Sequence, residues 1–215
     1  MLMRFTVIDG ALLHDHFHLA KTDECYFIRE YRTTDRFVAG ESLSLLKNLK
    51  KKPTEIGFRY KSSAIEKCAA EFSAVIESEA LNDWTFVPIP PSKINSHPEY
   101  DDRMVQVCKN IHAEKSPDVR EIVKQRVSTR AAHESAGNRL THDELLGNYY
   151  IDEKLTHPEP ENIAIVDDTI TAGTHFKAMQ AILSHRFPNA RIIGLIWVRR
   201  AIDNNAAISE FKDDS

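Results

Sequence analysis

The chain has 215 residues, of which 42% are hydrophobic and 28% charged, which suits one globular domain with a small appended element rather than two full domains. Its formal net charge of -4 does not favour a polyanion such as duplex DNA, so no nucleic-acid partner is expected. Three scattered cysteines, no signal-peptide profile and no run of about 18 apolar residues predict a cytoplasmic protein without a membrane segment.

The start of the chain predicts a β-hairpin. Residues 4–8 and 11–19 form two extended segments around Asp9-Gly10, a dipeptide that tolerates the positive φ angles of a tight turn. Three histidines of the second segment would share one face of a strand: His14, His16 and His18. Because three ligands on one flat strand rarely converge, an exposed polar face is favoured over a metal site.

Two helices are predicted next. Leucines at helical spacing indicate a helix over residues 42–52. Four lysines lie near its end: Lys47, Lys50, Lys51 and Lys52. Cations suit a helix C-terminus, so these are expected to form a solvated face. Ser63 and Glu66 then have the spacing of a capping box, and the apolar residues that follow, up to Ile76, recur with helical period.

The middle of the chain predicts a short strand, a helix and a long loop. Residues 84–89 are apolar and lead into prolines, which cannot donate to a sheet, so the strand must stop there. A helix is expected to begin at Pro98 or Glu99. Residues 115–147 are polar and rich in Arg and His, which predicts a long loop with a short strand at 121–123. Loops of this length are usually functional or mobile.

The last part of the chain alternates between strand and helix. The predicted elements are an extended segment at 149–152, a buried strand at 162–167, a helix at 174–187, an apolar strand at 190–198 and a frayed tail at 203–215. This alternation over residues 62–198 predicts an α/β fold with a parallel sheet covered on both faces. Ligands of such sheets bind at the carboxyl ends of the strands.

One such end carries the strongest chemical signal. Asp167 and Asp168 follow a buried strand, and small residues then lead into a helix: Thr171, Ala172, Gly173 and Thr174. Unpaired N–H groups at a helix start, together with hydroxyl donors, form a cradle for phosphate, and Gly173 permits a positive φ or a close approach of the backbone. The adjacent carboxylates can accept hydrogen bonds from a vicinal diol. The loop thus has the groups to hold a ribose 5-phosphate at both ends.

The segment VDDTITAGTH resembles the PRPP-binding loop of type I phosphoribosyltransferases, and the orotate enzymes carry a near match through TAGT. The resemblance implies the type I phosphoribosyltransferase fold, with a small N-terminal hood at residues 1–60, the core at 61–200 and a flexible tail at 201–215. It implies that Asp167 and Asp168 are catalytic and orient the ribose hydroxyls. The expected 5-phosphate-binding residues are Thr169, Thr171, Ala172, Gly173, Thr174 and His175. His175 stands where many members have Thr.

A weaker resemblance covers a second segment. FVPIPPSK followed by YDDRMVQV is similar to the strand, pyrophosphate loop and Arg-containing helix of ComF-like members. The long basic loop lies where type I members close a flexible loop over the reacting centre, and it carries Lys124, Arg126, Arg130, His133 and Arg139. The pyrophosphate-binding residues expected from both segments are Ser92, Lys93, Arg103, Lys124, Arg126 and Arg130.

The resemblance implies an enzyme that transfers phosphoribosyl from PRPP to a nitrogen acceptor such as a nucleobase, with release of pyrophosphate. The expected cofactor is Mg²⁺, bound through the substrate near the two aspartates without direct side-chain ligation. The expected partners are PRPP and a small-molecule acceptor, without a membrane, and a homodimer is one arrangement that fits the resemblance. Two alternatives stay open: a non-catalytic PRPP or nucleotide sensor on the same fold, and a hydrolase or effector that acts on nucleotides.

Overall fold

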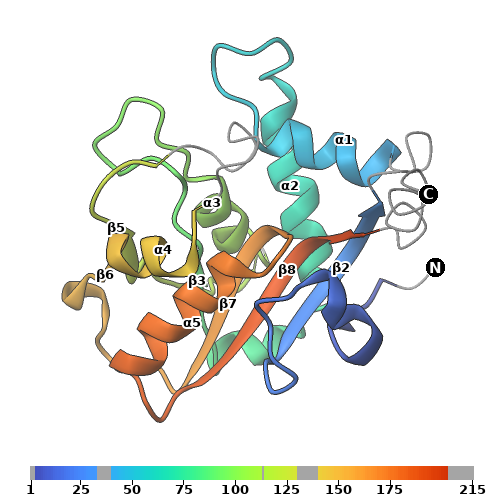
Figure 1. The fold of residues 1–215 in the computed structure, drawn as a ribbon. Helices are drawn as coiled ribbons and strands as arrows, with labels where there is room; N and C mark the ends of the chain where they lie inside the picture. The colour runs from blue at the N-terminus through green and yellow to red at the C-terminus, as the bar shows by residue number, and fades with distance from the viewer. Residues whose placement is uncertain (1–2, 33–39, 113, 130–139, 203–215) are drawn as a thin grey trace, which may run out of the picture.

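The computed structural model describes residues 3–32, 40–112, 114–129 and 140–202. Their centre is a six-stranded sheet with the order β1-β2-β8-β7-β3-β4 (Figure 1). These strands are β1 (Thr6–Val7), β2 (Cys25–Arg32), β3 (Thr85–Pro88), β4 (Asp118–Val119), β7 (Asn162–Ile170) and β8 (Arg191–Ala201). All neighbours pair in parallel except β1 and β2. The predicted α/β class with a parallel sheet is confirmed.

Helices cover both faces of the sheet. Residues of α1 (Gly40–Leu49), α2 (Tyr60–Ser73) and α3 (Arg103–Lys109) share one core cluster with the sheet residues Ala164 and Val166. Residues of α4 (His142–Asn148) and α5 (Thr174–Arg186) share the other cluster with Ile163 and Ile165. Alternate residues of β7 thus enter opposite cores, as the period of two in a strand requires. Short 3-10 turns lie at Gly10–Asp15, Ser78–Asn82 and Glu153–Leu155.

The predicted N-terminal hairpin is wrong. β1 pairs in antiparallel fashion with β2, a strand that was not predicted, while residues 10–15 form a 3-10 turn instead of an extended arm. Gly10 does have a positive φ, of 32°. Its turn is closed by a hydrogen bond from Leu12 N–H to the Asp9 carbonyl, at 2.7 Å. Leu12 and Leu13 of this turn pack against the core cluster that contains Ile163 and Ile165.

The capping-box prediction was also misplaced. α2 begins at Tyr60, so Ser63 and Glu66 lie inside the helix. A complete capping box occurs instead between Thr141 and Glu144 at the start of α4, within the stretch that was predicted to be loop. That stretch also contributes β5 (Val123–Gln125), which pairs with β6 (Tyr149–Ile151) in a two-stranded sheet. A local cap and a strand pair thus order part of the predicted long loop.

The boundary at residue 60 between the predicted hood and core falls within a shared core. Leu46 and Leu49 of α1 are buried in the same cluster as Ile65 and Phe72 of α2. β2, which precedes α1, forms a parallel ladder with β8 along seven paired positions from Cys25 to Arg32, so it belongs to the central sheet. Among the described residues, none of the helices has the length and apolar character that a membrane crossing needs.

Candidate functional site

The two adjacent acids lie within β7, which continues through Ile170 and so ends later than predicted. The ladder with β8 pairs Asp167 with Ile196 and Ile170 with Arg199. Successive side chains of a strand point to opposite faces of the sheet. Asp168 accordingly contacts Lys50, just after α1, and Arg103 of α3. Asp167 points to the other face, and its charge adds to the burial that raises the pKa of Tyr149. In the structure the two carboxylates therefore have different neighbours.

The turn that follows β7 has the predicted backbone. Gly173 caps α5 with a φ of 89°, which confirms the predicted positive φ. A Cβ atom at this position would lie 3.1 Å from the side chain of Leu19, tighter than ordinary packing. Glycine is therefore required both by its backbone angle and by the N-terminal segment that packs against the turn.

The N-terminal segment also orients the peptide groups of this turn. The ring of His16 hydrogen-bonds to the Thr171 carbonyl, and His18 N–H donates to the Ala172 carbonyl at 3.0 Å. In a planar trans peptide the N–H points opposite to the C=O, so the N–H groups of Ala172 and Gly173 point away from this segment. Neither group donates to another described residue. They are available to an anion at the start of a 13-residue helix.

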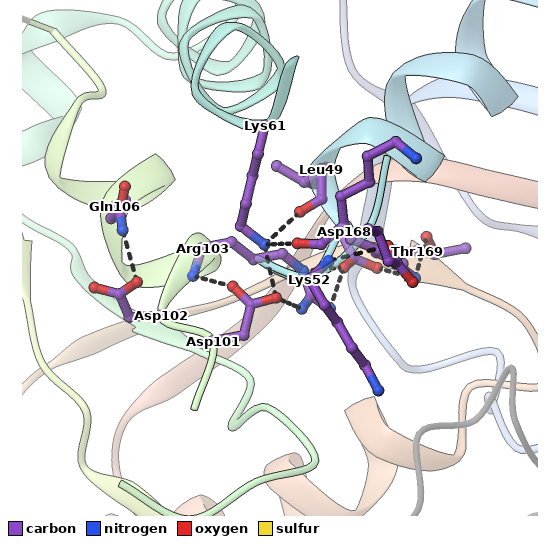
Figure 2. Close-up of polar contacts among 12 residues, drawn as sticks. Leu49, Lys52, Lys61, Asp101, Asp102, Arg103, Gln106, Asp168 and Thr169 are labelled. Atoms are coloured by element: carbon purple, nitrogen blue, oxygen red, sulfur yellow. Dashed lines mark hydrogen bonds and ion pairs between the residues drawn. The ribbon is translucent and has the colours of Figure 1, made fainter. Parts of the chain in front are cut away.

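Asp168 is buried and binds two cations from different elements. One of its oxygens lies 2.7 Å from Nζ of Lys50, just after α1. The other accepts from Nε and Nη2 of Arg103 at 2.9 and 2.7 Å (Figure 2). Burial alone would raise the pKa of Asp168, but the charges of Lys50 and Arg103 outweigh it and hold the pKa well below its usual range. Asp168 is therefore ionised, and both of its oxygens are engaged.

A second acid extends this network. Asp101 accepts from Nη1 of Arg103 at 2.6 Å and from Nζ of Lys61 at 2.8 Å (Figure 2). Lys61 also donates to the carbonyls of Leu49 and Lys51 at the end of α1, at 2.9 and 3.0 Å. We call Lys50, Lys61, Asp101, Arg103 and Asp168 the charged cluster. It ties α1, α2 and α3 to the carboxyl end of β7.

Asp167 has a different environment from its neighbour. It forms no ion pair with a described residue, and its Oδ1 accepts from the backbone N–H of Asp168 at 2.7 Å. Burial and the negative charge of Asp168 raise the pKa of Asp167, against the opposing charge of Lys50. Asp167 therefore takes up a proton more easily than an ordinary aspartate.

His175, the second residue of α5, lies against Tyr149. Its Nδ1 is 3.0 Å from the Tyr149 hydroxyl, and burial lowers the pKa of His175 to about 4, so the ring is neutral at pH 7. If the hydroxyl donates to Nδ1, the ring proton sits on Nε2 and leaves one donor free. The hydroxyls of Thr171 and Thr174 bond to no described residue, and that of Thr169 accepts from Lys50 at 3.3 Å.

The expected pyrophosphate-binding residues fall into separate groups. Arg103 belongs to the charged cluster. Ser92 and Lys93 lie beside Thr129, whose N–H donates to the Ser92 carbonyl at 2.7 Å and whose carbonyl accepts from Nζ of Lys93 at 3.4 Å. Lys124 pairs with an acid, Asp152, at 2.6 Å. Arg126 is exposed, with its guanidinium 5.3 Å from the centre of the Tyr150 ring. Arg130, His133 and Arg139 lie outside the described residues.

A small hollow, open to solvent, lies between β5 and the loop of Pro90 and Pro91 that follows β3. Lys93 and Lys124 line it, together with Tyr100 and Glu121. The Tyr100 hydroxyl donates to Glu121 at 2.6 Å. The residues of the turn before α5 do not line this hollow.

Within the residues that the structure describes, no three or more His, Cys, Asp or Glu side chains are grouped as a metal site. The exposed polar face predicted for the N-terminal histidines is wrong for His16, which is fully buried and accepts from Nε of Arg199 at 3.0 Å. Burial lowers the pKa of His16, opposed by its bond to the Thr171 carbonyl. His16 is thus a structural support of the turn.

Three contributors to this region were not identified from the sequence: Lys50, His16 and Tyr149. The lysine cluster near residue 50 was the available signal for the first, and it was interpreted as a solvated helix end. The alternating histidines marked His16 only as part of an exposed polar face or a metal site, and nothing in the local pattern marked Tyr149. No protein-family model and no curated protein matches the chain.

Proposed function

We propose that the chain binds PRPP at the carboxyl end of β7 and transfers its phosphoribosyl group to a nitrogen acceptor such as a nucleobase. The observation that carries this proposal is the turn at residues 171–174. Its carbonyls are held by His16 and His18 while its N–H groups and hydroxyls are unused by the described residues. Together with the start of α5, these groups suit the 5-phosphate, and acidic side chains lie next to them.

In the proposed reaction, the bond from C1 of the ribose to the pyrophosphate oxygen breaks, a bond from C1 to the acceptor nitrogen forms, and the proton of that nitrogen is released to solvent. The N–H groups of the turn hold the 5-phosphate, and the hydroxyls of Thr171 and Thr174 donate to its oxygens. Asp167 accepts a hydrogen bond from a ribose hydroxyl and so orients the sugar. Cations near the strand end stabilise the negative charge that develops on the leaving pyrophosphate.

The donor set fits Mg²⁺ that arrives with PRPP. Magnesium prefers oxygen ligands, and it usually takes one or two carboxylates plus phosphate oxygens. Asp168 has both oxygens engaged by cations, so Asp167 is the better placed carboxylate for such an ion. Bound Mg²⁺ would neutralise charge on the pyrophosphate as it leaves.

A second candidate is a non-catalytic sensor that keeps the PRPP pocket. The observation that favours it is the engagement of Asp168 by Lys50 and Arg103, because a carboxylate held in two ion pairs is not free to orient a substrate. The third candidate function is a hydrolase or effector that acts on nucleotides.

One experiment separates these functions. The protein is incubated with PRPP, Mg²⁺ and a panel of nucleobases, and pyrophosphate release and nucleotide formation are followed. Base-dependent release with matching nucleotide formation supports the transferase. PRPP binding without turnover on a broad panel supports the sensor, and release without any base supports hydrolysis. Absence of both binding and turnover contradicts the proposal.

A further inference from the structure

Two cations reach the same buried carboxylate from elements far apart in the sequence. Lys50 follows α1 and Arg103 begins α3, and each lies 2.7 Å from a different oxygen of Asp168. Lys50 also lies 3.3 Å from the Thr169 hydroxyl, so its ammonium group is at the end of β7 that leads into the turn.

Exposure differs between the partners of this contact. The side chain of Asp168 is 4% exposed, whereas those of Lys50 and Arg103 are 30% and 19% exposed. An anion that approaches from solvent can therefore contact the two cations while Asp168 lies behind them. Its phosphate oxygens can replace the carboxylate oxygens, because both are strong acceptors for Lys and Arg.

The local charge also favours an anion. The charged cluster contains three cations (Lys50, Lys61 and Arg103) and two ion-paired acids (Asp101 and Asp168). The nearby turn adds the partial positive charge of the α5 N-terminus. A polyphosphate is a chemical complement to this combination, since it brings several negative charges on adjacent groups.

We propose that Lys50, with Arg103, binds the pyrophosphate group of PRPP, and that this binding displaces Asp168 from its ion pairs. The displaced carboxylate then accepts hydrogen bonds from the ribose hydroxyls beside it. This inference rests on the proposed function and deepens it. It adds a pyrophosphate-binding residue from the N-terminal part of the chain. It also gives the ion pairs of Asp168 a role, because they hold the carboxylate until PRPP displaces it.

The ion pairs of Asp168 with Lys50 and Arg103 should affect which ligands bind tightly. Ribose 5-phosphate can occupy the turn but has no second anionic group to take over Lys50 and Arg103, so Asp168 stays paired. PRPP carries the pyrophosphate at C1 and can do both. Loss of the Lys50 charge should therefore weaken PRPP and leave ribose 5-phosphate nearly unaffected.

The test is calorimetric titration of the full chain with Mg²⁺ and either PRPP or ribose 5-phosphate. Lys50→Met is compared with Lys50→Arg and with Lys47→Met, a matched control because Lys47 is an exposed lysine of α1, the helix that Lys50 directly follows. Lys50→Met is expected to weaken PRPP by about 10- to 100-fold, the effect of one lost charge-assisted contact. Ribose 5-phosphate should change by less than about threefold, Lys50→Arg should keep PRPP within about fivefold, and Lys47→Met should match the wild type.

A second measurement needs no variant. In the wild type, the ¹³C signal of the Asp168 carboxyl group should shift on saturation with PRPP and not with ribose 5-phosphate. PRPP affinity of Lys50→Met within about twofold of wild type, or an unchanged Asp168 signal with PRPP bound, overturns this inference and leaves the proposed function standing. A wild-type chain that binds no PRPP overturns the proposed function itself.

Discussion

Asp167 and Asp168 are adjacent residues of the same type, yet the pKa of Asp167 is raised and that of Asp168 is lowered. Strand alternation sends Asp168 toward Lys50 and Arg103, which lower its pKa, and leaves Asp167 without an ion pair among the described residues. The sequence predicted that an acidic pair lies here and that a glycine turn follows. It did not predict how the two acids divide between faces, because that depends on where the strand ends and on side chains that arrive from other elements.

Gly173→Ala should destabilise the protein by about 1–3 kcal/mol. The backbone of the alanine would have to adopt a φ of 89°, and its Cβ atom would lie 3.1 Å from the side chain of Leu19. Urea denaturation measures the change. Gly147→Ala is the matched control, since Gly147 lies in α4 with open space around its Cβ position, and this variant should be neutral or stabilised by up to about 1 kcal/mol. Equal stability of the two variants would contradict the packing described for the turn.

His175 should make stability depend on pH. Its folded pKa of about 4 lies below the usual histidine value, so the unfolded state binds more protons between about pH 6.5 and 4 and the free energy of unfolding falls as the pH drops through that window. The raised pKa of Asp167 acts with the opposite sign, so a difference between variants is needed. His175→Asn cannot become charged and keeps an acceptor for Tyr149.

The measurement is urea denaturation of both proteins at pH 7, 6, 5 and 4. The wild type should lose stability relative to His175→Asn by up to about 1.4 kcal/mol per pH unit below pH 6.5. Parallel curves for the two proteins would show that His175 is not the neutral, buried group described above.

At the scale of elements, one arginine joins the N-terminal segment to the sheet. Arg199 of β8 forms ion pairs with Asp15 and Glu30 and donates to His16, which in turn bonds to the turn before α5. Asp15 and Arg199 are 3% and 2% exposed, so little solvent screens their interaction. The conformation of the turn therefore depends on residues that are far from it in the sequence.

Arg199→Met should lower the free energy of unfolding by about 3–5 kcal/mol, because it leaves the buried Asp15 without its charged partner. Arg191→Met is the control on the same strand: Arg191 pairs with Glu24 while both side chains are about half exposed, and this variant should cost at most about 1 kcal/mol. Thermal and urea denaturation of both variants give the comparison. Similar losses in the two variants would rule out the anchoring role of Arg199.

Elements with a strong local pattern were predicted well. The continuous apolar run of β7, the helix start after Gly173 and the proline stop after β3 each have a local physical cause, and all three occur in the structure. β2 was missed because its residues, CYFIREYR, become an interior strand only through the ladder with β8. The N-terminal hairpin failed for the same reason, since β1 found a more distant partner than the adjacent arm.

At the scale of the whole molecule, the charged cluster is a product of strand order. β7 lies between β8 and β3, and helices that flank these strands bring Lys50 and Arg103 to the same end of β7. The sequence could suggest that Arg103 is functional through its resemblance to a known motif. It could not bring Lys50 to Asp168, because the two residues meet only once the complete sheet and its helical layer are formed.

Because only Asp168 belongs to the charged cluster, the two aspartates should differ in their contribution to stability. Asp168→Asn leaves Lys50 and Arg103 without their acceptor charge and should cost about 3 kcal/mol. Asp167→Asn removes no ion pair, retains an oxygen for the N–H of Asp168 and removes a buried charge whose raised pKa makes it unfavourable at pH 8, so this variant should be at least as stable as the wild type. Urea denaturation at pH 8 compares the variants. A larger loss for Asp167→Asn than for Asp168→Asn would contradict this assignment.

The most direct test of the proposed site is therefore calorimetric titration of PRPP with Mg²⁺ into the wild type and Asp167→Asn at pH 8. The account predicts that the wild type binds, that Asp167→Asn binds at least about tenfold more weakly because a carboxylate acceptor for the ribose is lost, and that the variant is at least as stable to urea as the wild type. No binding by the wild type, or equal affinity in the two folded proteins, would contradict a PRPP site at the end of β7.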